Sequence, residues 1–406
     1  MSNTSKNNKI ICIVIMSLTA ALFAQSRWHK ENSGTNRDLS FVTVINDSVF
    51  VVGDSGTILI STNGHDWNMQ QTGTSFSLAG LTGNTEKLVT VGENGTIFTS
   101  DNRIDWVKEL SGTERNLNSV TWDGEKFVAV GDSGTIIISF NGVSWINKST
   151  DSEFMLKSVA CNNTTLAAVG RKNTVWDSCA VILTSTDGVS WKSQSVEQYA
   201  PLNHILWNGL KFYAVGCNST ILNSIDGNEW NICNAGSVGS QELTSITKYF
   251  DRYLTAFGEN YLFFSYFDDM LWTEYEPSSL PQTTLQSIAW LDRYILFIAV
   301  GINGMIYTAE DDDTSVLITI DKNSQNRNID ICISNKILRA FIPHNMMKGN
   351  VSIEIYSLTG KKILATSNST ADCEYTLALT NCAPGVYQLS VNNGRKRLTR
   401  QFIYSH

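Results

Sequence analysis

A short unit of sequence recurs along most of this 406-residue chain. An apolar run ends in glycine, a polar turn and a second apolar run follow, and a Trp closes the unit, as in "VVGDSGTILISTNGHDW" (51–67). The glycine recurs at positions 53, 92, 131, 170, 216, 258 and 301, at spacings of 39, 39, 39, 46, 42 and 43 residues. Such a period means that one supersecondary unit is copied and that neighbouring copies bury a shared core.

Each repeat has the pattern of four short β-strands. In the third repeat, strand patterns over 117–122, 126–131 and 135–139 are separated by Asp/Gly turns, and Trp145 opens a fourth strand. β-Branched runs bounded by Gly, Asn and Asp are typical of hairpins, and no helical period appears, which excludes an α-solenoid. Four strands in about 40 residues is the size of a propeller blade. We therefore predict an all-β fold with a seven-bladed β-propeller over 27–309.

The count of tryptophans predicts how the propeller closes. Seven glycines mark the repeats, but only six tryptophans lie within them, because the seventh repeat ends without one. Trp28, near the N-terminus, precedes Trp67 by the same 39 residues. In a closed ring the other end of the chain can supply the outer strand of the last blade, which removes a sheet edge. We predict that the strand at Trp28 closes the ring; the alternative is that "SVLITID" (315–321) fills that place.

Residues that recur at fixed places in the repeat are interpreted as structural before any functional role is considered. A large aromatic side chain at one place in every blade is typical of packing between blades. The predicted structural tryptophans are Trp28, Trp67, Trp106, Trp145, Trp191, Trp230 and Trp272. The acids of the glycine turns, Asp54, Glu93, Asp132 and Glu259, either bond their own backbone or form an acidic rim on one face.

The segments before these tryptophans carry a resemblance. "STNGHDW" (61–67), "SFNGVSW" (139–145), "STDGVSW" (185–191) and "SIDGNEW" (224–230) resemble the Asp-box turn of sialidase-like propellers, and also repeats of photosystem II assembly-factor-like propellers. The usual Asp-box has one more residue between its Asp and Gly, and Asn replaces Asp in the copies of the first and third repeats, 61–67 and 139–145. The resemblance covers about 27–310 and implies the fold; the arginine cluster, nucleophilic Tyr and acid of a sialidase have no recognisable counterpart.

The first 26 residues have the features of a signal peptide. Lys6 and Lys9 precede an apolar run over 10–24, which has the length of a signal h-region and is short for a membrane span. We expect cleavage at about residues 24–26 and no transmembrane anchor; an uncleaved anchor is the alternative.

Export permits disulfide bonds. Seven cysteines remain after the signal segment, so at least one has no disulfide partner. Cys373–Cys382 is the predicted local disulfide, whereas Cys161–Cys179 and Cys217–Cys233 depend on geometry. No CxxC pair occurs and the histidines are scattered, so we predict neither a metal site nor a cofactor.

The last 90 or so residues stop repeating. A linker over 310–324 is followed by strand and turn patterns over 325–406, which predict a small antiparallel sandwich. "IEIYSLTGKKIL", "PGVYQLSV" and "NGRKRLTRQFI" occur there in order and resemble the C-terminal sorting domain of type IX secretion cargo. The resemblance implies recognition by the type IX secretion machinery and a secreted or outer-cell-surface location. Arg400 stands where a Lys is more usual, and an ordinary accessory sandwich is the alternative.

Charge and motifs limit the function classes. A net charge of −8 without a basic stripe argues against a nucleic-acid partner. No nucleophile elbow, P-loop or HExxH motif is visible, so no catalytic residue is assigned. Three hypotheses remain: a non-catalytic binding module for an extracellular glycan or protein, a secreted glycan-active enzyme of sialidase-like fold, and an assembly factor for an exported complex.

One repeat differs from the others and locates a candidate site. The glycine-to-Trp interval is 14 residues in five repeats and 21 in the fourth, where "GRKNTVWDSCAV" (170–181) replaces the short turn. This insertion brings Arg171, Lys172 and Trp176 to an acidic face, and Tyr199 follows in the next connection. Arg and aromatic residues often dominate binding sites. We predict that these four residues form one side of a ligand site; the alternative is a tolerated surface insertion.

Overall fold

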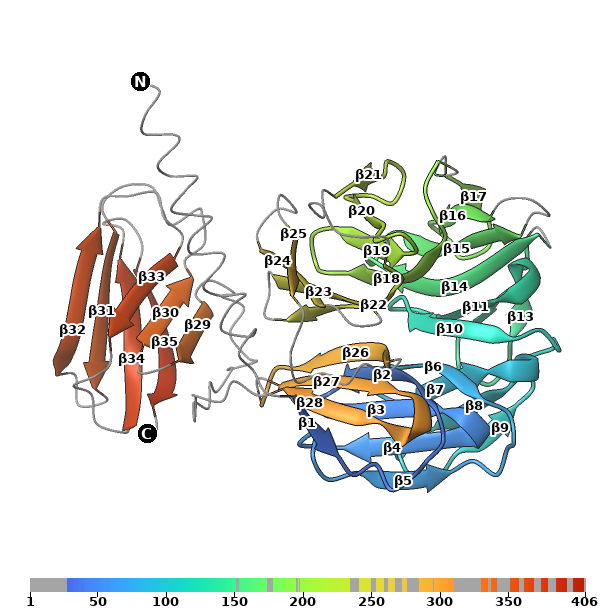
Figure 1. Cartoon of the computed structure of the whole chain (residues 1–406), viewed down its shortest axis with the longest axis horizontal. Helices are drawn as coiled ribbons and strands as arrows, with labels where there is room; N and C mark the ends of the chain where they lie inside the picture. The colour runs from blue at the N-terminus through green and yellow to red at the C-terminus, as the bar shows by residue number, and fades with distance from the viewer. Residues whose placement is uncertain are drawn as a thin grey trace. The chain divides into compact units, whose positions relative to one another are not determined.

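The computed structural model describes residues 28–309 and 330–404, apart from 151–152, 174–177, 195, 197, 234–240, 250–252, 259–261, 267–271, 276–284, 295, 335–336, 342–350, 358–360, 369–373, 379–384 and 393–396. The chain divides into two compact units, Met1–Glu310 and Asp311–His406. Each unit is described by itself below. Figure 1 shows both as assemblies of strands.

The described part of the first unit forms seven antiparallel four-stranded sheets. Six of them take four consecutive strands: β2 (Leu39–Ile45), β3 (Ser48–Gly53), β4 (Thr57–Ser61) and β5 (Asn68–Gln71); β6 (Leu78–Gly83), β7 (Leu88–Gly92), β8 (Ile97–Ser100) and β9 (Val107–Glu109); β10 (Leu117–Trp122), β11 (Phe127–Gly131), β12 (Ile136–Ser139) and β13 (Ile146–Asn147); β14 (Phe154–Cys161), β15 (Leu166–Asn173), β16 (Ser178–Ser185) and β17 (Lys192–Ser193); β18 (Leu202–Trp207), β19 (Phe212–Gly216), β20 (Ile221–Ser224) and β21 (Asn231–Ile232); β22 (Leu243–Tyr249), β23 (Tyr253–Gly258), β24 (Leu262–Tyr266) and β25 (Trp272–Tyr275).

The last sheet combines the two ends of the unit. It contains β26 (Leu285–Leu291), β27 (Leu296–Gly301), β28 (Ile306–Ala309) and the N-terminal strand β1 (Trp28–Glu31). β1 pairs antiparallel with β28, with Trp28 opposite Ala309 and Glu31 opposite Ile306. Short 3-10 turns join the second and third strands of four sheets: η1 (Asp54–Gly56), η2 (Glu93–Gly95), η3 (Asp132–Gly134) and η4 (Ile302–Gly304). The prediction of an all-β fold built from four-stranded units is confirmed.

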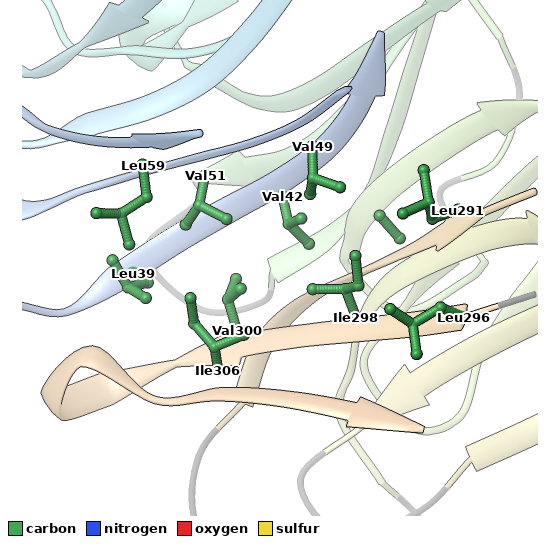
Figure 2. Packing of buried hydrophobic residues seen from close by; sticks show 11 residues of the cluster. Leu39, Val42, Val49, Val51, Leu59, Leu291, Leu296, Ile298, Val300 and Ile306 are labelled. Atoms are coloured by element: carbon green, nitrogen blue, oxygen red, sulfur yellow. The ribbon is translucent and has the colours of Figure 1, made fainter. Parts of the chain in front are cut away.

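The core lies between neighbouring sheets, because side chains alternate between the two faces of each strand. β3, β11 and β27 are buried along their whole length, which explains why the second strand of a repeat is a continuous apolar run. Figure 2 shows one such interface, where Leu39, Val51 and Leu59 of the first sheet meet Leu296 and Ile298 of the last. Packing between neighbouring sheets therefore provides the core of the first unit.

The first strand of each of these seven sheets carries a β-bulge near its start. In β10, Leu117 pairs with Gly131, whereas Ser119, two residues on, pairs with Val130. A bulge leaves the extra residue out of the ladder, and the first strand has no partner strand on its other edge. Backbone N–H and C=O groups there need partners from elsewhere, since leaving them buried and unpaired is costly.

Side chains of the preceding sheet supply acceptors for the N–H groups that follow the bulge. The acceptor is the side chain two positions after the Leu that pairs with the repeat glycine. In five cases it accepts from a backbone N–H of the next sheet: Val159 N–H to Ser119 Oγ (3.3 Å), Ile205 N–H to Ser158 Oγ (3.2 Å), Ile246 N–H to His204 Nδ1 (3.2 Å), Ile288 N–H to Ser245 Oγ (3.3 Å) and Val42 N–H to Ser287 Oγ (3.3 Å). The last of these bonds joins the last sheet to the first. We call these five contacts the inter-sheet bonds.

The first and second sheets lack the side-chain acceptor that forms the inter-sheet bonds. Phe41 and Gly80 stand at the acceptor position in the first and second sheets, and neither side chain can accept. The Phe41 ring instead lies 6.2 Å, centroid to centroid, from the ring of His204 in the fifth sheet. An aromatic contact therefore joins first strands of two sheets that are not neighbours in the chain.

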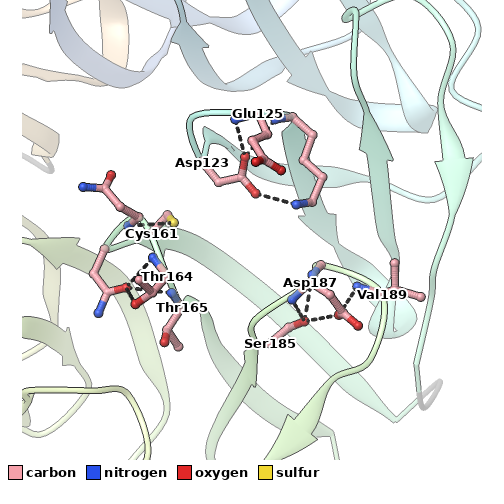
Figure 3. A network of polar contacts seen from close by, with 12 residues as sticks. Asp123, Glu125, Cys161, Thr164, Thr165, Ser185, Asp187 and Val189 are labelled. Atoms are coloured by element: carbon pink, nitrogen blue, oxygen red, sulfur yellow. Dashed lines mark hydrogen bonds and ion pairs between the residues drawn. The ribbon is translucent and has the colours of Figure 1, made fainter.

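The Asp-box segments form one recurring turn. Asp187 Oδ1 accepts from the N–H groups of Val189 (2.7 Å) and Ser190 (2.8 Å), and Trp191 Nε1 donates to the Gly188 carbonyl (3.1 Å), as Figure 3 shows in part. The bonds from Ser190 and Val189 lower the pKa of Asp187 to about 2. Asn63, Asn102 and Asn141 hold the same two N–H groups through Oδ1, which explains why Asn can replace Asp.

The tryptophans before the fourth strands lie against the cores. Trp28 and Trp272 are buried, and Trp67, Trp106, Trp145, Trp191 and Trp230 pack partly buried on clusters between sheets. In β1, Glu31 Oε1 accepts from Thr308 Oγ1 (2.6 Å) and lies 2.9 Å from His65 Nδ1 of the first sheet. β1 is thus held by backbone pairing, one buried ring and one carboxylate.

The structure tests two of the three predicted cysteine pairs. Cys161 lies opposite Leu166 and Cys179 opposite Lys172, so their partners are six residues apart on β15, about 20 Å. A disulfide requires Cα atoms within about 7 Å, so the Cys161–Cys179 alternative is wrong. Cys217 carries a free thiol, which removes the Cys217–Cys233 alternative as well. Cys373 and Cys382 lie outside the described residues.

The second unit contains two antiparallel sheets within its described residues. One is β29 (Asp330–Ser334), β30 (Ile337–Phe341) and β33 (Glu374–Ala378); the other is β31 (Val351–Ser357), β32 (Lys362–Asn368), β34 (Gly385–Asn392) and β35 (Arg397–Tyr404), in the order β32-β31-β34-β35. Leu338, Ile353, Ile355, Leu389 and Val391 are fully buried. On the other side of β31, Glu354 pairs with Lys362 and accepts from Tyr356 Oη (2.7 Å).

We predict that Trp28→Ala destabilises the first unit by about 3–5 kcal/mol, because a buried aromatic ring is removed from the strand that pairs with the outer edge of β28. Thermal unfolding of the mature chain measures the loss. Lys30→Ala, an exposed position on the same strand, is the control and should leave the melting temperature nearly unchanged. Equal melting of all three proteins would contradict the role of β1.

His204 predicts a pH dependence of stability. The residue is partly exposed, but its ring is surrounded by protein, and this burial lowers its pKa to about 4 from an ordinary 6.5. Between these values the unfolded state binds more protons, so stability is present above pH 6.5 and lost as pH falls toward 4, by up to about 3 kcal/mol. Urea unfolding at several pH values measures the loss. His204→Ser, the residue found in four other sheets, should flatten this part of the profile.

Candidate functional site

The insertion in the fourth repeat lengthens a hairpin. β15 and β16 have eight residues each, and their ladder continues through Arg171–Ala180 and Lys172–Cys179 to Asn173–Ser178. At the corresponding place the first, second, third and last sheets turn through η1 to η4. The extension stands on the face that carries these turns and the connections between sheets, which we call the turn face. Trp176 lies outside the described residues.

Arg171 and Lys172 point to opposite sides of this hairpin, because successive residues of a strand alternate. Lys172 pairs with Phe154, which packs on the core between the third and fourth sheets, and Lys172 Nζ lies 3.6 Å from Glu153 Oε2. Arg171 lies opposite Ala180, which packs in the core between the fourth and fifth sheets. The sequence prediction treated the two cations as one pair, and the structure separates them.

Tyr199 lies on the same side as Arg171. Its carbonyl accepts from Ala180 N–H (3.0 Å), its N–H donates to the Val196 carbonyl (3.0 Å), and its ring packs partly buried on the core that contains Ala180. Arg171 Nε is buried without a hydrogen-bond partner. Tyr199 therefore supports the base of the extended hairpin, and whether it also contacts a ligand stays a prediction.

A hollow that the sequence analysis missed lies on the other side, between the third and fourth sheets. It has a volume of about 280 Å³ and is lined by Glu114, Arg115, Asn116, Asp132, Ser133, Glu153, Phe154 and Met155. Lys172 stands beside it through its contact with Glu153. The signal in the sequence was Met155, which stands where Asp38 and Asn116 precede the first strands of other sheets.

The acids of the turns have local partners. Glu93 Oε2 accepts from Ser77 N–H (3.0 Å), and Asp132 accepts from Asn116 Nδ2 (3.1 Å) and Asn118 Nδ2 (2.9 Å). Two of the turn carboxylates thus bond the turn face itself, while they still give it negative charge. Glu259 lies outside the described residues.

The described residues lack two kinds of feature. No group of three or more His, Cys, Asp or Glu residues there could hold a metal ion. No helix in the same part of the chain is long and apolar enough to cross a membrane.

Comparison with solved structures identifies the architecture of the first unit. YCF48 bound to D1 peptide is similar with a TM-score of 0.57 at 13% identity, over 70% of this chain and 95% of that chain. The WD40 β-propeller domain of Doa1 is similar with a TM-score of 0.57 at 12% identity, over 70% and 96%. The Cps50 (Swd1) β-propeller domain of Myceliophteria thermophila has a TM-score of 0.53 at 11% identity, over 69% and 98%.

The first unit has the β-propeller fold. The predicted propeller fold is thereby confirmed, and at these identities the likeness shows the fold alone. No curated protein matches the chain. The sialidase-like part of the resemblance stays a prediction.

Residues 340–405 match the secretion system C-terminal sorting domain. This segment is a type IX sorting domain. This confirms the interpretation of the C-terminal motifs, since β31 to β35 lie within the matched segment. The sorting domain assigns the chain to the type IX secretion machinery and to export.

Proposed function

We propose that the chain is a non-catalytic binding module that the sorting domain carries out of the cell, and that the propeller holds a protein or peptide ligand on its turn face. The observation that carries the proposal is the extended hairpin, where Arg171 and Lys172 flank an otherwise compact surface next to a hollow. YCF48, a propeller of similar fold, was solved bound to a peptide, which favours a peptide ligand over a glycan. Trp176 and Tyr199 belong to the proposed site.

We also infer that the seven sheets are blades of one closed ring, with β1 as the outer strand of the seventh blade. The side-chain contacts of β1 support this inference. Glu31, three residues after Trp28, accepts from Thr308, seven after Gly301; Glu109, three after Trp106, accepts from Thr99 (3.0 Å), seven after Gly92. β1 thus has the same contact in its sheet as β9 has in the second.

The connection that follows β1 repeats as well. "SGT" (33–35) leads from β1 to the first sheet, and "TGT" (72–74) and "SGT" (111–113) lead from β5 and β9 to the next sheets. Ser33 Oγ and Ser111 Oγ each donate to the carbonyl two residues on, at 3.1 and 3.0 Å. The bond from Val42 N–H to Ser287 Oγ further supports a ring that continues from its seventh blade to its first.

The proposed route begins with a signal peptide over residues 1–26 and ends at the outer cell surface or in the medium. The basic residues of the sorting domain, such as Lys362 and Arg397, contrast with an acidic propeller. This contrast supports separate roles, the propeller for binding and the sorting domain for transport.

Replacing "RKNTVWDSCA" (171–180) by the Asp-Ser-Gly turn of the third blade tests the binding site. The mature chain and the variant are compared on peptide and glycan arrays, with release of sugar or peptide fragments measured in parallel. We expect the wild type to bind without turnover, and the variant to melt within a few degrees of it and lose binding. A folded variant that binds as before would place the site elsewhere, and turnover would favour the enzyme hypothesis.

Fusing Asp311–His406 to an inert exported reporter tests the transport role. In a host with the type IX machinery, we expect the reporter outside the outer membrane, measured by protease accessibility of intact cells. A fusion that ends at residue 339, before the matched segment, is the control and should stay in the periplasm. Periplasmic retention of both fusions would contradict the role.

A further inference from the structure

The 3-10 turns of the propeller present one backbone donor to the next blade. In η4, Asn303 N–H donates to Asp38 Oδ1 (2.7 Å), and in η2, Asn94 N–H donates to Asn116 Oδ1 (3.0 Å). The acceptor is in both cases the residue before the first strand of the following blade. A different donor lies one residue further along the turn: Gly56 N–H donates to the Phe76 carbonyl (2.9 Å), and Ser219 N–H donates to the Gln241 carbonyl (2.7 Å). Side-chain oxygen atoms of the next blade therefore satisfy the N–H of the second residue after the repeat glycine at two turns, η2 and η4.

The third blade keeps the donor and lacks the acceptor. Ser133 has φ 56° and ψ 39°, which match Asn94 (52°, 41°) and Asn303 (55°, 35°), so its N–H points in the equivalent direction. Met155 stands at the acceptor position, and a thioether is a weak acceptor. Within the part of the chain that the structure describes, Ser133 N–H makes no hydrogen bond.

A lost acceptor alone does not make a site. Ser77 stands at the same position after η1, and Ser55 N–H also has no partner among the described residues. The difference is the hollow, which is lined by Ser133 together with Phe154 and Met155. At the third blade, therefore, a backbone donor opens into a concave space with an apolar side.

The charges around the hollow favour a cationic ligand group. Glu114, Asp132 and Glu153 line it against Arg115, and Lys172 stands beside it. Glu114 and Glu153 are exposed. A lysine or arginine side chain can lay its methylene groups on Phe154 and Met155 while its charged end reaches these carboxylates.

We propose that this hollow binds a basic peptide segment, whose main-chain carbonyl accepts from Ser133 N–H in place of the side-chain oxygen that Asn116 and Asp38 provide elsewhere. The proposal rests on the proposed binding function and adds the ligand class and the residues that select it. A main-chain carbonyl fits this role because it is an amide oxygen acceptor of the same kind as Asn116 Oδ1, which accepts from Asn94 N–H. One hydrogen bond and exposed ion pairs make the affinity micromolar or weaker.

Met155→Asn tests the proposal by restoring the acceptor of the sister blades. The matched control is Ser77→Asn, the same new side chain at the equivalent position of another blade. Two labelled heptapeptides of alternating Ala and Lys, or Ala and Glu, serve as probes, and fluorescence anisotropy with the mature full chain measures binding. Hydrogen exchange of the segment that contains Ser133 is followed with and without each peptide.

We expect the Lys peptide to bind and to slow exchange at Ser133, and Met155→Asn to weaken it at least tenfold while Ser77→Asn does not. Glu153→Gln should weaken binding of the Lys peptide as well. If Met155→Asn does not fold, the affinity of Glu153→Gln tests the proposal in its place. Equal binding of the Glu peptide, no binding of either peptide at about 1 mM, or an unchanged affinity of Met155→Asn would each overturn the proposal. If the chain binds a ligand on the arrays and Met155→Asn does not change that binding, the proposed function stands and this site alone is refuted.

Discussion

The propeller depends on how the free edges of its first strands are satisfied. A strand at the edge of a sheet has unpaired N–H and C=O groups, and here the bulge adds to them. The five inter-sheet bonds satisfy the N–H groups with side chains of the preceding sheet. Asn118 Nδ2 and Asn203 Nδ2 do the same for the carbonyls of Leu156 (2.7 Å) and Leu243 (3.0 Å). Five of the seven sheets therefore receive a side-chain acceptor from the preceding sheet at this edge.

The repeat was readable because glycine and Trp are required at fixed places. Gly53, Gly131 and Gly170 approach the backbone of the first strand so closely that an added Cβ would lie 1.9–2.1 Å from a carbonyl oxygen. No other residue fits, so the spacing survives in the sequence. The inter-sheet acceptors were not readable, because Ser, His, Phe and Gly all occur at that position and share no pattern.

The sequence showed which repeat carries the candidate site, but it did not show how the side chains of that site are arranged. The seven extra residues at 171–180 showed which blade differs, yet they extend a ladder, and alternation along a strand then places Arg171 and Lys172 on opposite sides. The hollow is lined by Met155, and the role of that position becomes visible only when Asp38 and Asn116 are seen to accept from the turns of other blades.

The pairing of β1 with β28 has a consequence for the order of folding. Trp28 must find Ala309, and contacts between residues so distant in sequence form slowly, because the intervening chain has to be ordered first. A chain made or exported from its N-terminus delivers β1 first and its partner strand last. Until residue 309 arrives, β1 is an unpaired strand and the last sheet is incomplete, which makes this interval the one in which the chain is most exposed to aggregation and proteolysis.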